Sequence, residues 1–193
     1  MDCDIDLAVK TPETWAATVL SDFDAFLADH ANCERKASGQ AMSMVMKYAD
    51  RPKILPSLIR IAREELEHFA DVYALMAERN VTLSADTKDP YVTALRPRLR
   101  HGRDERLLDS LLLAGILEAR GGERFALVAS AVDEASLREF YERLAIGEER
   151  HRRLYVTMAR RYFDRATVAD RLAELLEAEG RVVRELEIRP ALY

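Results

Sequence analysis

The feature that most constrains this chain is a short motif, Glu-x-x-His, that occurs twice. The first copy is Glu65 with His68, and the second is Glu148 with His151. Residues three apart on an α-helix project from one face, one turn apart. Each copy can therefore offer a carboxylate oxygen and an imidazole nitrogen to a single metal ion. Two of the chain's four histidines are placed in this way, so the repeat predicts helices and metal binding together.

Each motif also has a glutamate upstream, Glu34 before the first and Glu118 before the second. One Glu from each of two helices, with a Glu-x-x-His from each of two others, is the ligand set of di-iron four-helix bundles. Glutamate-rich surface helices also produce Glu-x-x-His by chance, but here the flanking apolar residues place the candidates on inward faces. The predicted metal ligands are Glu34, Glu65, His68, Glu118, Glu148 and His151. Glu65 and Glu148 are the expected bridging carboxylates.

The rest of the chain also favours helix. Only 7 Gly and 6 Pro occur in 193 residues, and apolar periodicity predicts helices at about 11–20, 22–49, 53–79, 104–132, 133–162 and 167–186. Residues 80–103 break the pattern and predict a long crossover with at most a short helical turn. The expected fold is an all-α, ferritin-like four-helix bundle with this crossover between bundle helices 2 and 3 and additional terminal helices. Residues 1–193 are expected to form one domain.

Composition and the start of the chain argue against several classes of protein. There is no apolar run long enough to cross a bilayer, and Asp2, Asp4 and Asp6 stand where a signal peptide would be basic. A cytoplasmic protein without membrane association is therefore expected. Cys3 and Cys33 supply neither a disulfide framework nor a four-cysteine iron site.

The charge is unevenly distributed. The net charge of −5 argues against non-specific binding of nucleic acid, yet residues 96–103 carry four arginines and no acid. Residues 150–165 form a second arginine-rich stretch. Concentrated arginine on an acidic protein favours a local anionic partner, and the alternative is arginine paired with neighbouring acids on solvated faces.

Three further positions leave their roles open. Gly121 and Gly122 lie in the middle of a predicted helix, where they indicate either a close approach of two helices or room for a substrate. His30 and Asp71 are conceivable hydrogen-bond partners of the metal ligands, although ordinary packing or solvation is the preferred interpretation for both.

Over nearly its whole length the sequence resembles the bacterial tRNA hydroxylases of the MiaE type, which have a ferritin-like fold. The resemblance is carried by residues 33–37 (CERKA), 63–69 (REELEHF), 118–125 (EARGGERF) and 148–151 (EERH). It implies hydroxylation of the isopentenyl side chain of a 2-methylthio-adenosine beside the tRNA anticodon, with two iron ions in a carboxylate-bridged centre. O2 and an external electron donor, a ferredoxin or a reductase, are the implied partners. The six ligand positions match the family without a gap.

A tRNA substrate gives the arginines a role. The anticodon loop offers unpaired bases and a row of phosphates, so Arg96, Arg98, Arg100 and Arg103 are candidate tRNA-binding residues. Two alternatives remain, a di-iron hydroxylase of another apolar substrate such as a quinone precursor and a ferritin-like iron-handling protein. A monomer or a dimer is expected.

Overall fold

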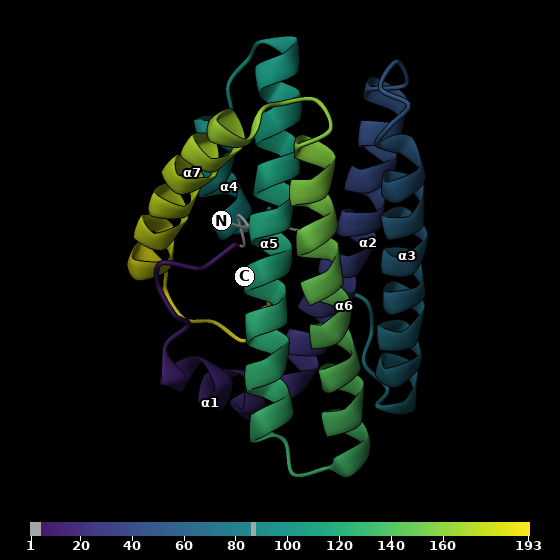
Figure 1. Ribbon diagram of the computed structural model, residues 1–193. Helices are drawn as coiled ribbons and strands as arrows, with labels where there is room; N and C mark the ends of the chain where they lie inside the picture. The colour runs from purple at the N-terminus through teal and green to yellow at the C-terminus, as the bar shows by residue number, and fades with distance from the viewer. Residues whose placement is uncertain (1–4, 86–87) are drawn as a thin grey trace. The chain divides into compact units, whose positions relative to one another are not determined.

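A computed structural model describes residues 5–85 and 88–193, and within these residues it is helical and contains no strand (Figure 1). The expectation of an all-α fold is confirmed. The elements in chain order are α1 (Glu13–Ser21), α2 (Phe23–Lys47), α3 (Leu55–Glu78), α4 (Pro90–Leu95), the short 3-10 helix η1 (Arg96–Arg98), α5 (Arg103–Ala131), α6 (Ala135–Ala159) and α7 (Arg165–Glu185). None of these helices is long and apolar enough to cross a membrane.

The chain divides into two compact units. One contains residues 1–13, 88–187 and 193, and the other contains residues 14–87 and 188–192. We call them the α5–α6 unit and the α2–α3 unit after the long helix pair that each contains. Whether the two units together form one domain over residues 1–193 depends on how they are joined. The expectation of a single domain therefore stays a prediction.

The α2–α3 unit is built on a helical hairpin whose two helices lie side by side (Figure 1). Asp22 caps α2 by accepting a hydrogen bond from the backbone nitrogen of Ala25 at 3.2 Å, which satisfies a free amide of the first turn. Pro56 lies in the first turn of α3, where no backbone donor is needed. Residues 48–54 join the helices, and so short a connection makes them antiparallel neighbours.

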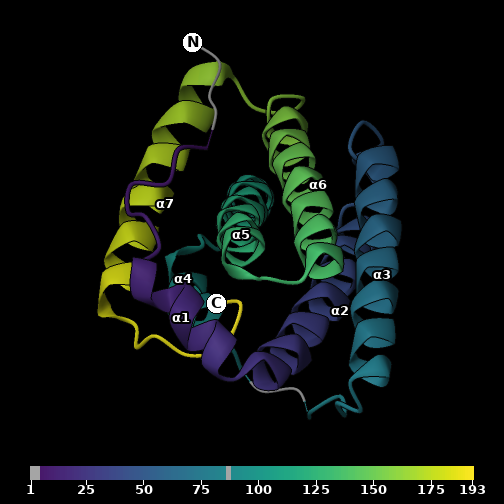
Figure 2. The same cartoon turned by 90° about the horizontal axis from the view of Figure 1, so that it is seen from below.

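In the α5–α6 unit, α5 lies between α6 and α7, as Figure 2 shows most clearly. Residues 111–116 of α5 are all buried, and consecutive side chains such as Leu111, Leu112 and Leu113 face different directions. A helix of this kind is covered on all sides. Three residues, 132–134, connect α5 to α6.

The connection between α3 and α5 contains more helix than the sequence indicated. Two helical segments, α4 and η1, occupy residues 90–98, so the expectation of at most a short turn was wrong. Asp89 caps α4 by accepting from the backbone nitrogen of Val92 at 3.0 Å, and Pro90 fills the first helical position. Buried Tyr91 and Leu95 pack with residues of α7 in one apolar cluster. Packing on α7 therefore stabilises a helix that is too short to form alone.

The structure also assigns a role to the paired glycines of α5. A Cβ atom added to Gly122 would lie 3.1 Å from Cβ of Glu148 and 3.6 Å from the carbonyl oxygen of Ala145. One added to Gly121 would lie 3.2 Å from the hydroxyl of Tyr193. Close packing thus requires small residues here, and it brings α6 directly against the part of α5 that carries Glu118.

Candidate metal centre

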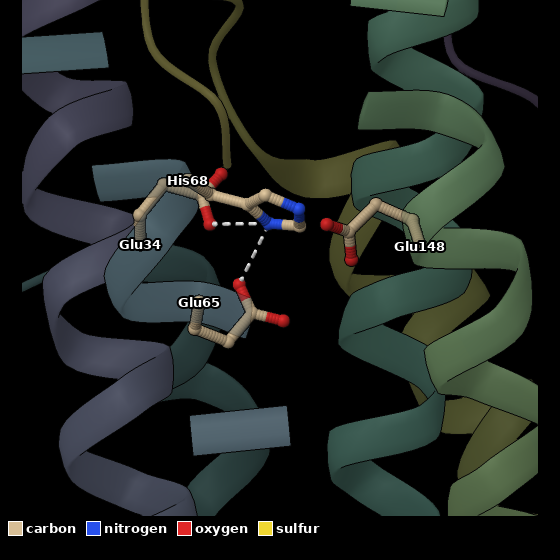
Figure 3. A group of neighbouring side chains, drawn as sticks. All are labelled: Glu34, Glu65, His68 and Glu148. Carbon is tan, nitrogen blue, oxygen red and sulfur yellow. Dashed lines mark hydrogen bonds and ion pairs between the residues drawn. The ribbon is translucent and has the colours of Figure 1, made fainter. Parts of the chain in front are cut away.

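Three of the predicted ligands come together inside the α2–α3 unit. Glu34 lies on α2, while Glu65 and His68 lie one turn apart on α3. The His68 ring stands between the two carboxylates, with its Nδ1 atom 3.3 Å from Oε2 of Glu65 and 3.7 Å from Oε2 of Glu34 (Figure 3). One ligand atom from each residue lies within 4.8 Å of the others. Glu34 and Glu65 are 3% and 1% exposed, so both carboxylates have lost most of their water.

The electrostatics of this group favour a cation. Burial alone would raise the pKa of Glu34, but hydrogen bonds with His30 and His68 more than offset burial and hold that pKa well below its usual range. Burial alone would lower the pKa of His68, but Glu34 and Glu65 raise it to about 10. Two buried carboxylates therefore create a negative potential that retains a positive charge between them. A metal ion bound here would replace the proton that gives the His68 ring its positive charge.

The other three predicted ligands come together inside the α5–α6 unit. Glu118 lies on α5, and Glu148 and His151 lie one turn apart on α6. Nδ1 of His151 is 3.9 Å from Oε2 of Glu118, and one ligand atom from each of the three residues lies within 4.8 Å of the others. All three are buried. This group repeats the composition of the first: one glutamate from one helix, and a Glu-x-x-His from its partner.

Both groups have the chemistry of a transition-metal site. Carboxylate oxygen and imidazole nitrogen are ligands that suit iron and manganese, and burying several carboxylates without a cation would cost several kcal/mol for each ion. Within the described residues, all six predicted ligands fall into these two groups and none points elsewhere in the chain. The donor sets therefore fit metal ions, and the buried carboxylates and imidazoles indicate a metal site.

His30 is the functional residue that the sequence left undecided. Its Nε2 atom lies 2.7 Å from Oε1 of Glu34, and the side chain is fully buried. The ring therefore holds the glutamate in position, and the preferred interpretation of ordinary packing was wrong. The available signal was the four-residue spacing of the two side chains on the apolar face of α2. Asp71, the other candidate, is exposed, in agreement with the preferred interpretation.

The four arginines of residues 96–103 fall into two kinds. Arg96, Arg98 and Arg103 are exposed. Arg100, whose side chain is 41% exposed, also binds the fully buried Asp109 of α5 through both its side chain, at 2.7 Å, and its backbone nitrogen, at 2.8 Å. It therefore fixes this segment onto α5. Contact of the four arginines with tRNA stays a prediction.

Arg171 of α7 completes the arrangement around Asp109. It binds the same carboxylate at 2.9 Å and donates to the carbonyl oxygen of Arg98 at 2.7 Å. Burial alone would raise the pKa of Asp109, but Arg100 and Arg171 lower it below its usual value. The basic segment is thus held in a defined conformation with its exposed arginines in solvent.

Comparisons with known proteins agree with this geometry. A protein of Pseudomonas putida named tRNA 2-(methylsulfanyl)-N(6)-isopentenyladenosine(37) hydroxylase is 37% identical to this chain, over 92% of the chain and 85% of the relative. A protein of the same name from Salmonella typhimurium is 25% identical, over 79% of the chain and 74% of the relative.

The fold has a solved counterpart. The structure titled "Protein 43 with aldehyde deformylating oxygenase activity from Synechococcus" matches with a TM-score of 0.91 and 36% identity, over 96% of this chain and 94% of that one. The expectation of a ferritin-like fold is thereby confirmed. The family model described as tRNA-(MS[2]IO[6]A)-hydroxylase (MiaE) matches residues 3–193, and the chain therefore belongs to the MiaE family.

Proposed function

We propose that this protein is an O2-dependent di-iron monooxygenase that hydroxylates the isopentenyl side chain of 2-methylthio-N6-isopentenyladenosine beside the tRNA anticodon. One observation carries the proposal. A chain of the MiaE family buries two groups of ligands, each composed of a glutamate and a Glu-x-x-His pair. Two relatives, one of them 37% identical, are named for this reaction. A tRNA substrate would place the enzyme in the cytoplasm.

The proposed cofactor is a pair of iron ions, to which each group would contribute one glutamate and one Glu-x-x-His pair. The residues that would hold the ions are Glu34, Glu65, His68, Glu118, Glu148 and His151, and Glu65 and Glu148 remain the carboxylates expected to bridge. Two iron ions would supply the chemistry that reduces O2 and oxidises a C–H bond. The overall balance takes O2, two electrons and two protons together with one C–H bond, and yields one C–OH group and one water. The two electrons come from an external donor, a ferredoxin or a reductase.

The protein's own groups position this chemistry. His30 fixes the Glu34 carboxylate by a 2.7 Å contact, so that one oxygen keeps a constant orientation. Gly122 packs closely on Cβ of Glu148 and so restricts the base of that side chain. Burial of both groups excludes bulk water, which would otherwise quench an oxidant able to attack a C–H bond.

The exposed arginines of residues 96–103 are proposed to bind the phosphates of the anticodon loop. Replacing Arg96, Arg98 and Arg103 together by Ala should weaken tRNA binding and reduce its salt dependence, because each lost phosphate contact lowers the slope of log K against log salt by about 0.7–0.9. Iron content should stay the same. The control is Arg181→Ala, which removes an exposed arginine of α7 that pairs with Glu177. Unaltered tRNA binding in the triple variant would exclude this surface.

The decisive experiment is a product assay. Iron-loaded, reduced protein and O2 are supplied to tRNA that carries the prenylated nucleoside, and the digested nucleoside is analysed for a mass gain of one oxygen atom. Glu65→Ala should abolish both iron binding and product. Glu67→Ala, an exposed neighbour on the same helix, should leave both unchanged. Absence of product from wild-type protein with iron bound and reduced would reject the proposed substrate.

The Synechococcus structure favours one alternative strongly enough to test in parallel. Its title assigns aldehyde deformylating oxygenase activity to a protein of this fold at 36% identity. A long-chain aldehyde should therefore be offered to the same iron-loaded protein. Loss of its formyl group, without oxygen transfer to tRNA, would move the assignment to an oxygenase of aliphatic substrates. Our proposal predicts oxygen transfer to the nucleoside.

A further inference from the structure

A cavity of about 540 Å³ opens in the α5–α6 unit. It has a volume typical of small-molecule sites, which occupy roughly 300–1,000 Å³. Its helical walls contain the small or apolar residues Ala119, Gly122, Ala126, Ala145 and Ile146, the predicted metal ligand Glu118, and the charged residues Glu123, Glu149 and Arg152. The cavity therefore has small and apolar side chains on both helical walls and reaches the predicted metal ligand Glu118.

The third wall comes from the segment before α1. Ile5 and Leu7 contribute apolar side chains to the cavity. Arg152 of α6 donates to the carbonyl oxygen of Ile5 at 2.6 Å, and Thr11 donates its hydroxyl to Glu123 of α5 at 2.7 Å. Because both ends of the segment are tied to the helices, the wall is in place before any ligand binds.

Exposure changes from the inner end of the cavity to its mouth. The side chain of Glu118 is 9% exposed, whereas Ile146 is 69% exposed. Lys10 also lines the cavity, and its side chain is 81% exposed. Three charged wall residues have partners, since Glu149 pairs with Arg152 and Glu123 accepts from Thr11, while Asp6 also lines the cavity. An apolar chain can enter without leaving those charges unpaired.

We propose that this cavity receives the prenyl side chain of the tRNA nucleotide, with the chain directed at Glu118, the base against Ile146, and Lys10 near a phosphate. This inference rests on the proposed function and adds the residues that select the substrate. The small side chains at positions 119, 126 and 145 set the width of the channel, and Ile146 provides apolar contact area at its mouth. Selection is by shape and apolar burial, because the prenyl group offers no polar atoms to bind.

The test measures binding of nucleosides to iron-loaded protein without reductant or O2, so that its readout does not depend on turnover. N6-isopentenyladenosine and adenosine are compared by equilibrium dialysis. Wild-type protein should prefer the prenylated nucleoside by about 100-fold, the effect of partly burying a five-carbon chain. Ala126→Trp narrows the channel, and Ile146→Asp places a charge at its mouth. Each should reduce the preference at least about 10-fold.

Ala70→Trp is the matched control, since Ala70 is an exposed alanine in the middle of α3 that does not line the cavity. It should bind as the wild type does. Both cavity positions are exposed, so their variants are expected to fold, and circular dichroism checks this. Iron content should be equal in all variants, which separates the cavity from the ligand set.

The outcomes distinguish the cavity from the reaction. Loss of preference in both cavity variants but not in Ala70→Trp supports the inference. Wild-type preference in both variants, or no preference in a wild-type protein that forms hydroxylated tRNA, overturns the cavity and leaves the proposed function standing. No hydroxylated tRNA from iron-loaded wild-type protein rejects the proposed function and the inference together.

Discussion

The buried ion pair between Arg120 of α5 and Glu179 of α7 allows a quantitative test of how the α5–α6 unit is held together. Both side chains are fully buried. Arg120 donates to Oε1 of Glu179 through Nε at 2.9 Å and Nη2 at 2.7 Å, and Nη2 also donates to the carbonyl oxygen of Val9 at 2.8 Å. Nη1 of Arg120 donates to the hydroxyl of Thr11 and to the carboxylate of Glu123. One guanidinium thus joins two helices to the segment before α1.

Arg120→Met removes these contacts and leaves the charge of Glu179 buried. Breaking a buried pair on one side costs about 3–5 kcal/mol. For a chain of this size, each kcal/mol shifts Tm by about 2–4 °C, so a decrease of roughly 6–20 °C is expected. The double variant Arg120→Met/Glu179→Gln should recover a large part of the loss, because Gln is neutral and still accepts the hydrogen bond that Tyr91 donates at 2.8 Å.

The assay is urea unfolding at neutral pH followed by circular dichroism, with thermal scans alongside. Arg181→Met on α7, the helix that carries Glu179, is the control, because Arg181 is 46% exposed and pairs with an exposed glutamate. That variant should lose less than about 0.5 kcal/mol. A loss below about 1 kcal/mol for Arg120→Met, or a double variant no more stable than the single one, would refute the assignment of Glu179 as a charge that Arg120 neutralises.

Three further predictions each rest on one local feature of the structure. Asp109→Asn should destabilise the protein by about 2–4 kcal/mol, since Arg171 loses a buried partner. Because the folded-state pKa of Asp109 is lowered, the stability that its carboxylate contributes is present above the ordinary Asp pKa and is lost as pH falls through the lowered value. The stabilities of wild type and variant in acid should therefore converge at that lowered pH. His30→Gln should weaken iron binding by about 10-fold in chelator competition, because Glu34 loses the ring that positions it. Asn80 has φ of 58°, so Asn80→Val should cost about 1–2 kcal/mol in urea unfolding, whereas Asn80→Gly should be close to neutral.

The parts of this structure that could be read from the sequence are those set by local spacing. Apolar periodicity gave the long helices, and the three-residue spacing of Glu65 and His68 gave the composition of one ligand group. The contact of His30 with Glu34 could have been predicted for the same reason, since the two residues are four apart on α2. Local periodicity determines which residues share a helix face, and that information was sufficient for these features.

Other features depend on packing between distant segments. Arg120 and Glu179 are 59 residues apart, and many other acids in the chain would have suited Arg120 equally well by sequence. Arg100 belongs to a basic stretch and yet binds a buried aspartate, which charge counting cannot reveal. The helix α4 was underestimated because its stability comes from α7 and not from its own residues. Contacts of this kind become visible only when the helices are packed.

The attachment of the segment before α1 has a consequence for the order in which the protein can form during synthesis. Val9 is held by Arg120, 111 residues further along the chain, and its side chain touches Gly180 of α7, with only 3.0 Å between Cγ2 of Val9 and a Cβ placed on that glycine. A ribosome makes both partners, Arg120 and Gly180, more than a hundred residues after Val9. Since such long-range contacts form late, Val9 cannot take its final place against α7 until residue 180 has been made, whereas the contacts of Ile5 with α6 and of Thr11 with α5 can form earlier.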